Sequence, residues 1–123
     1  MKSEHNFTSP RNLFEKLIRD SNKFEEEPNG DNLFNLLATV YHLTEWIKKS
    51  PISSHEATKR MLKKVSHNPM MKNCCKIIEG DTGFVFELDE QNKAVLKFGE
   101  EIFDPFEMKD EIISIFKEYF EIK

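Results

Sequence analysis

The chain has 123 residues, of which 38% are hydrophobic and 33% charged, and its formal net charge is −4 at pH 7. This length and composition are typical of one globular domain over residues 1–123 and argue against disorder of the whole chain. No apolar run approaches the roughly 18 residues of a membrane span, and residues 1–10 lack the apolar core of a signal peptide, so we expect a cytoplasmic protein with no membrane partner.

Two amphipathic helices are predicted in the first part of the chain. Ser9 and Pro10 are typical of an N-cap and a first helical position, and this helix is expected to end before Pro28. After the turn at 28–31, a second helix is expected over Asn32–Lys49. Its apolar residues cover more than one face, which predicts the central helix of the core.

A third and a fourth helix follow. Ser53 and Glu56 have the spacing of a capping box, which predicts a helix that runs to about Ser66. Pro69 then begins a short fourth helix, and Gly80 is expected to close it in a left-handed conformation.

The last third of the sequence predicts a hairpin and a terminal helix. Phe84, Phe86 and Leu88 alternate with Val85, Glu87 and Asp89, which predicts a strand. A turn follows at 90–92, and a second strand is expected over 93–98. Asp104 and Pro105 then announce a last helix over about 105–121. The hairpin is expected to pack its phenylalanine face on this helix or to add an edge to a partner's sheet. The fold class is therefore α+β and mostly α: about five amphipathic helices packed as a bundle, with one C-terminal antiparallel β-hairpin before the last helix.

Motifs of several enzyme and cofactor classes are missing from the sequence. It has no glycine-rich phosphate loop, no Gly-x-Ser-x-Gly elbow and no His-Glu-x-x-His pair, and its four glycines do not suit a cofactor cradle. We therefore expect no cofactor. His42 and Glu45 lack a further ligand at zinc-site spacing, so no metal site is expected either. Cys74 and Cys75 are adjacent, which predicts two reduced thiols on a packed helix, with a redox or vicinal-disulfide role as the alternative.

The charge of the chain is unevenly distributed. Residues 1–47 carry a net −3, residues 48–76 carry +7, and residues 77–123 carry −8. A basic middle segment can bind phosphates or an acidic partner, because clustered lysines and arginines attract polyanions. It can equally form ion pairs with the acidic last helix of the same chain.

Arg60 and His67 lie seven residues apart, so a helix places both on nearly the same face, with Lys64 between them. An arginine that stabilises phosphate oxygens beside a histidine that moves protons suits metal-independent RNA cleavage. This spacing resembles the Arg-x(4 to 6)-His motif of HEPN-type helical-bundle ribonucleases. The resemblance implies a bacterial toxin or antiphage setting and activity as a dimer. The helix dipole offers a second explanation, because it favours a positive charge at a helix C-terminus.

A second resemblance lies in the predicted central helix. The residues Leu33-Phe34-Asn35 and Tyr41-His42-Leu43-Thr44-Glu45-Trp46 resemble small, largely uncharacterised bacterial helical proteins, in which a Phe-Asn pair precedes Tyr-His-Leu-x-Asp/Glu-Trp. Those proteins continue with a Lys-His pair that this sequence lacks. The resemblance implies a similar helical fold and a bacterial or phage origin.

Four residues of the same helix form a polar and aromatic stripe: Asn35, Thr39, His42 and Trp46. One interpretation is a small buried network in which Asn35 and His42 find partners and fix the helix register. The other is a binding surface with Trp46 as its anchor.

These patterns favour a small macromolecule-binding module of a bacterial defence, toxin-antitoxin or phage-related system over an enzyme. The expected contact residues are Lys59, Arg60, Lys63, Lys64, Trp46 and His42. The expected partner is a protein or an acidic surface, with RNA as the alternative, and the chain itself is a candidate homodimer. The alternative function is a HEPN-like ribonuclease with Arg60 and His67 as catalytic residues.

Overall fold

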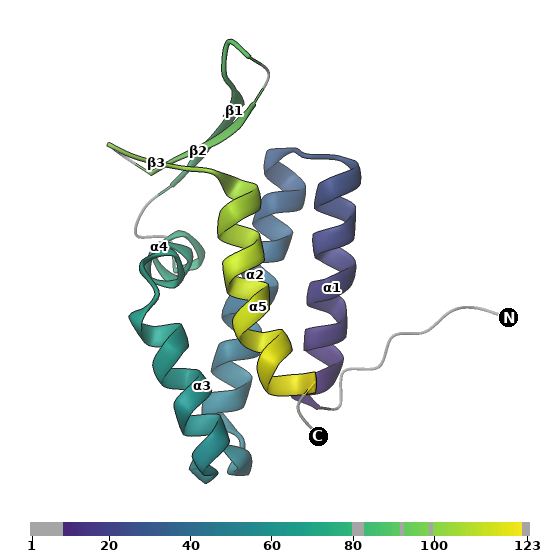
Figure 1. Cartoon of the computed structure of the whole chain (residues 1–123), viewed down its shortest axis with the longest axis vertical. Coiled ribbons are helices and arrows are strands. Elements are labelled where there is room, and N and C mark those ends of the chain that lie inside the picture. The colour runs from purple at the N-terminus through teal and green to yellow at the C-terminus, as the bar shows by residue number, and fades with distance from the viewer. Residues whose placement is uncertain (1–8, 80–82, 92, 99, 122–123) are drawn as a thin grey trace, which may run out of the picture.

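A computed structural model describes residues 9–79, 83–91, 93–98 and 100–121. These ranges contain the α-helices α1 (Pro10–Glu26), α2 (Gly30–Lys49), α3 (Glu56–His67), α4 (Pro69–Ile78) and α5 (Pro105–Glu121), and the 3₁₀-helix η1 (Pro51–Ser54). The strands are β1 (Val85–Leu88), β2 (Ala94–Phe98) and β3 (Glu101–Phe103). The predicted α+β, mostly helical fold class is confirmed. Figure 1 shows α1, α2 and α5 side by side, with α3 and α4 along one side and the strands at one end.

The first, second and last helices begin where the sequence predicts, within two residues. The backbone N–H of Ser9 donates to Asn12 Oδ1 at 3.1 Å before α1, and Asn29 Oδ1 accepts from the amide of Asn32 at 2.8 Å before α2. Asp104 Oδ1 accepts from the amides of Phe106 and Glu107 at the start of α5. Side-chain oxygens thus satisfy amides that a helix start leaves free.

The predicted start of the third helix is wrong. Ser53 lies inside η1, and the N-cap of α3 is His55, whose backbone is extended. Ser50 and Pro51 open an earlier turn, because Ser50 Oγ accepts from the amide of Ile52 at 3.3 Å. Of the apparent capping box, Ser53 therefore belongs to this turn, and only Glu56 lies in α3. The predicted cap at Gly80 lies outside the described residues.

The hairpin is present, but a third strand, β3, was not predicted. The sheet has the order β1-β2-β3 and both pairs are antiparallel. Phe86, Leu96 and Phe103 form one row across the three strands, and Leu96 is fully buried. Phe86 meets Phe24 of α1 edge-on at 5.9 Å, and β2 contacts α5. The inner face of the sheet therefore covers one end of α1 and α5.

The core is centred on α2, as the sequence predicts. Its fully buried residues are Leu33, Leu36, Leu37, Val40, Leu43 and Ile47. Burying each of these side chains stabilises the fold by about 1.5–3 kcal/mol relative to leaving it exposed to water. The same cluster includes Met61 and Val65 of α3 and Phe116 of α5, so both helices contribute buried side chains to one core with α2. Among the described residues, no helix is both long enough and apolar enough to cross a membrane.

Candidate functional site

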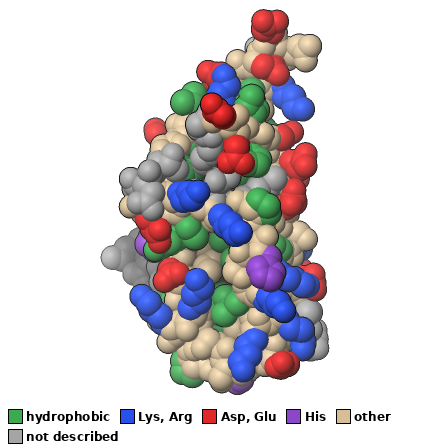
Figure 2. Space-filling model, turned by 90° about the vertical axis from the view of Figure 1, so that its left-hand side faces the viewer, with side chains coloured by type: hydrophobic (Ala, Val, Ile, Leu, Met, Phe, Trp, Pro, Cys, Tyr) green, Lys and Arg blue, Asp and Glu red, His purple; other side chains and the backbone are tan. Residues whose placement is uncertain are grey.

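The outward face of α3 carries four cations: Lys59, Arg60, Lys63 and Lys64, which we call the α3 cationic face. Thr58, Met61 and Val65 are buried, so the helical repeat turns the residues next to them toward solvent. All four cations are exposed. In Figure 2, lysine and arginine side chains gather over the lower part of the face that α3 and α4 present to the viewer.

α3 lies beside the acidic last helix, as the ion-pairing alternative for the basic segment requires, but among the described residues only one of the four cations forms an ion pair there. Lys64 Nζ lies 3.0 Å from Glu118 Oε1 of α5, and both side chains are more than half exposed. Such a surface pair is worth about 0–1 kcal/mol. Lys59, Arg60 and Lys63 form no ion pair with any residue that the structure describes. Three of the four charges therefore face solvent unpaired within this part of the chain.

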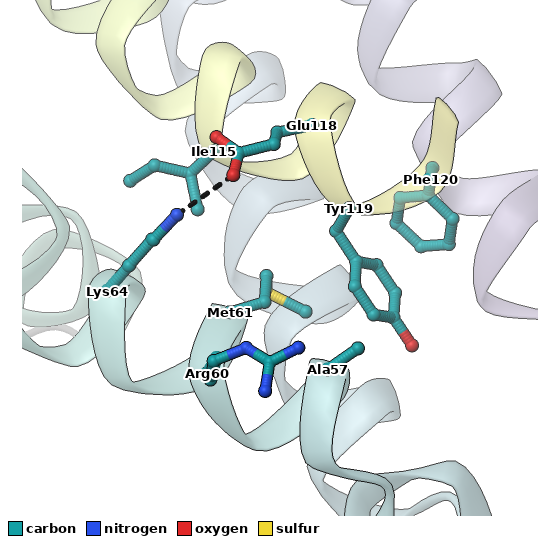
Figure 3. Close-up of a pocket in the computed structure, with 8 residues that line it drawn as sticks. All are labelled: Ala57, Arg60, Met61, Lys64, Ile115, Glu118, Tyr119 and Phe120. Atoms are coloured by element: carbon teal, nitrogen blue, oxygen red, sulfur yellow. Dashed lines mark hydrogen bonds and ion pairs between the residues drawn. The ribbon is translucent and has the colours of Figure 1, made fainter. Parts of the chain in front are cut away.

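A groove of about 480 Å³ runs between α3 and α5 beside these cations. Figure 3 shows its lining, with Ala57 and Met61 on α3 opposite Ile115, Tyr119 and Phe120 on α5. The charged residues along it are Arg60, Lys64 and Glu118. An apolar floor with charged side chains at its edge is typical of a site that binds another chain or a small molecule.

Hydrogen bonds and ring contacts hold the α5 side of the groove. The hydroxyl groups of Tyr119 and Thr58 lie 2.6 Å apart and join α5 to α3. The ring of Phe120 stacks on Phe14 of α1 at 4.8 Å, and Arg11 Nη1 donates to the carbonyl of Phe120 at 2.9 Å. The groove wall is thus fixed by contacts to both neighbouring helices.

Arg60 and His67 are both exposed on α3, but only Arg60 lines the groove. His67 is the last residue of the helix, and seven residues of α-helix correspond to about 10 Å along its axis. Within one chain, Arg60 and His67 therefore lie on the same helix, but no pocket formed by the described residues contains both.

The four residues of the stripe on α2 differ in burial, which the sequence did not predict. Asn35 and His42 are exposed, so the buried-network interpretation is wrong for these two side chains. Thr39 is the buried member, and its hydroxyl donates to Asp20 Oδ2 at 2.6 Å while Lys16 Nζ lies 2.7 Å from the same oxygen. This network joins α2 to α1.

Trp46 and His42 also lie apart from the groove. Trp46 is half-buried, and the ring of His42 meets Tyr41 edge-on at 5.6 Å. Neither residue lines the groove between α3 and α5. Of the expected contact residues, the four cations therefore lie together on α3, whereas His42 and Trp46 lie on α2.

The two cysteines are free thiols. Cys74 is buried, and its Sγ donates to the carbonyl of Leu37 at 3.2 Å. Burial, with the neighbouring Cys75 as a smaller cause, raises the pKa of Cys74 to about 12. Cys75 is half-buried, and burial followed by the carboxylate of Glu79 raises its pKa as well. Across the described ranges, no cluster of three or more His, Cys, Asp or Glu residues is arranged to hold a metal ion.

Sequence reasoning missed the α5 side of the groove. Ile115, Tyr119 and Phe120 are not among the expected contact residues, although all three are half-buried and line the groove. The available signal was the mixture of aromatic and acidic residues in the last two turns of α5.

We compared the chain with protein-family models, with curated proteins and with solved structures, and none of the three comparisons gave a match.

Proposed function

We propose that this chain is a small interaction module that binds an acidic partner protein through the α3 cationic face. The observation that carries the proposal is the exposure of Lys59, Arg60 and Lys63 on adjacent turns, where none of them forms an ion pair with a residue that the structure describes. Like charges held this close repel one another. An acidic surface removes that repulsion and is attracted during the diffusional encounter.

A partner protein fits the charge distribution better than a nucleic acid does. A nucleic-acid-binding domain typically has a pI above about 9, whereas the pI of this sequence is about 5.6. α5 exposes Glu118 and Glu121 next to the cationic helix. A phosphate backbone that extends past α3 would meet these carboxylates, while a protein segment can place its carboxylates on α3 and uncharged side chains toward α5.

The biological setting in this proposal is a bacterial defence, toxin-antitoxin or phage-related system. It rests on the resemblance of residues 33–46 to small bacterial helical proteins and on no structural feature. A homodimer is part of the same proposal. Both expectations are separable from the binding surface, which is argued from α3 alone.

Ribonuclease activity with Arg60 and His67 is the second candidate function. It is supported by the exposure of both side chains on a continuous α3. It ranks second because His67 does not share the groove with Arg60. Incubation of the protein with structured and single-stranded RNA without metal ions tests it. Cleavage that Arg60→Ala and His67→Ala both abolish would establish the ribonuclease and overturn the binding-module proposal.

The binding proposal is tested with a charge-reversed protein and a matched control. The double variant Lys59→Glu/Lys63→Glu reverses two charges of the α3 cationic face, and Arg19→Glu/Lys117→Glu makes the same change at exposed positions on α1 and α5. Because Lys117 lies close to the groove, a second control, Arg19→Glu/Lys23→Glu, reverses two exposed charges with the same spacing on α1 alone. Binding of a fluorescein-labelled acidic peptide is followed by anisotropy at several salt concentrations. The α3 variant should lose about tenfold or more in affinity and most of the salt dependence, and the controls should lose little.

Three results of this titration would contradict the proposal. The first is equal loss in the α3 variant and the α1 control, which would indicate a response to net charge alone. The second is an affinity that salt does not change. The third is tighter, salt-sensitive binding of a single-stranded RNA oligonucleotide than of the acidic peptide, which would assign the surface to nucleic acid.

A further inference from the structure

The groove between α3 and α5 adjoins the α3 cationic face, and the two surfaces differ in chemistry. Ala57, Met61 and Ile115 contribute apolar surface, and Tyr119 and Phe120 contribute aromatic surface. Arg60 and Lys64 of the α3 cationic face line the same groove, and Lys59 and Lys63 lie beside them on the same helix. A partner that covers the cations therefore also lies across the mouth of the groove.

The groove is large enough to receive an aliphatic or aromatic side chain. Its volume of about 480 Å³ lies in the lower part of the ~300–1,000 Å³ range of ligand pockets. Interfaces draw much of their affinity from a few apolar anchors that fill such pockets, while the charged rim sets orientation and rate. A flat acidic surface would leave this groove filled with water.

The charges at the rim are asymmetric. Lys64 is paired with Glu118, so its charge is already partly neutralised. Arg60 lines the groove and forms no ion pair with any described residue. A guanidinium group presents a fork of donors that matches a carboxylate. Arg60 is therefore positioned to bind a carboxylate on the α3 side of a ligand that occupies the groove.

We propose that the α3–α5 groove receives one aliphatic or aromatic side chain of an acidic segment of the partner protein, while Arg60 binds a carboxylate next to that anchor. This inference rests on the proposed function, because it assumes the acidic partner, and it adds which kind of segment the partner supplies. Lys59 and Lys63 lie outside the groove on the same helix and reach further carboxylates of the segment. A small organic anion would leave those two charges uncovered, which favours a segment with several acidic residues.

The test compares two labelled acidic peptides that differ at one central position, leucine in one and alanine in the other. Both carry the same charge, so the α3 cationic face attracts them equally. The wild-type protein should bind the leucine peptide about tenfold more tightly, because only that side chain reaches into the groove and buries apolar surface there. This comparison requires no change to the protein.

A filled groove provides the second arm of the test. Ala57→Leu places a larger side chain in the groove without changing charge, and Ser66→Leu adds the same side chain at an exposed position on α3 outside the groove. Ala57→Leu should abolish the preference for the leucine peptide and leave the alanine peptide unaffected. Ser66→Leu should keep the preference. A single-charge variant, Arg60→Gln, should weaken both peptides.

The outcomes separate this inference from the proposed function. If both peptides bind wild type with equal affinity and the binding weakens with salt, the groove inference is overturned and the acidic-partner proposal stands. If Ala57→Leu lowers the affinity of both peptides equally, the groove inference also fails. If neither peptide shows salt-sensitive binding, the proposed function itself is overturned.

Discussion

The hydroxyl groups of Thr58 and Tyr119 lie 2.6 Å apart, and they join α3 to α5 at the groove. Thr58 is 1% exposed, so its hydroxyl depends on a protein partner rather than on water. The two residues are 61 positions apart in the sequence. This contact fixes the distance between the cationic helix and the acidic helix, and with it the width of the groove.

Removing the Tyr119 hydroxyl should destabilise the fold. Tyr119→Phe keeps the ring and leaves the Thr58 hydroxyl buried with its Tyr119 partner removed, which should lower the free energy of unfolding by about 1–3 kcal/mol. Urea denaturation measures the change. The double variant Thr58→Val/Tyr119→Phe is the control, because it removes both groups and should cost less than the two single changes added together. Strictly additive losses would show that the two hydroxyls do not interact.

Lys109 should make stability depend on alkaline pH. Its side chain is 3% exposed, and Nζ lies 2.7 Å from Asp110 Oδ1 and 2.6 Å from Glu25 Oε2. Burial acts to lower the pKa of Lys109, but hydrogen bonds to Asp110 and Glu25 outweigh it and raise the pKa. A lysine whose pKa is higher in the folded state contributes stability in full below its unfolded pKa of about 10.4 and loses it as pH rises through the folded pKa.

The variant Lys109→Met isolates this contribution. It keeps an unbranched buried side chain, and the carboxylates it leaves behind are more than half exposed and stay hydrated. The free energy of unfolding of wild type minus that of Lys109→Met should be constant from about pH 7 to about pH 9 and should fall above about pH 10.5. A difference that stays constant through pH 11, or that grows, contradicts the assignment.

The two thiols should react at very different rates in the folded protein. A pKa of about 12 leaves Cys74 almost wholly protonated at neutral pH, and its burial blocks a reagent. Cys75 is half-buried and should react slowly at about pH 8. Labelling with a thiol-specific reagent and mass spectrometry should find one modified cysteine before unfolding and two after it. Cys75→Ser should remove the native reaction. Equal labelling of both thiols in the native state contradicts the packing of α4.

Asp104 and Ser53 allow a true helix cap to be distinguished from an apparent one. Asp104→Ala removes the acceptor of two amides at the start of α5 and should lower the free energy of unfolding by about 1 kcal/mol. Ser53→Ala changes a residue of η1 that does not cap α3, so a change within about 0.5 kcal/mol is expected. Chemical denaturation of both variants measures the difference. The prediction fails if Ser53→Ala is the more destabilising change.

The sequence predicts the elements whose ends carry explicit signals. The Ser9-Pro10 and Asp104-Pro105 pairs mark α1 and α5 correctly, since proline fits only the first turn of a helix. Ser53 shows the limit of such signals. It has the capping-box spacing to Glu56, but it belongs to the η1 turn and does not cap α3. β3 spans three residues and is too short to show a periodic pattern.

The candidate site was predicted on one side only. Exposure of Lys59, Arg60, Lys63 and Lys64 follows from the helical repeat of α3, which the sequence contains. The groove depends on which residues of α5 lie opposite, and no local pattern specifies that Tyr119 meets Thr58. Lys109 is similar, because its partner Glu25 is 84 residues away and a lysine is ordinarily assigned to the surface.

The most direct test of the central claim is to map where an acidic segment binds. Two-dimensional amide spectra of isotope-labelled protein are recorded during titration with the acidic leucine peptide. The proposed function predicts salt-sensitive shifts concentrated at residues 57–64 of α3, and the groove inference adds residues 115–120 of α5, with α1 and the strands unchanged. Shifts centred on α1, on the outer face of the sheet or around Trp46 and His42, or no shifts at low salt, would contradict the claim that the α3 cationic face is the binding surface.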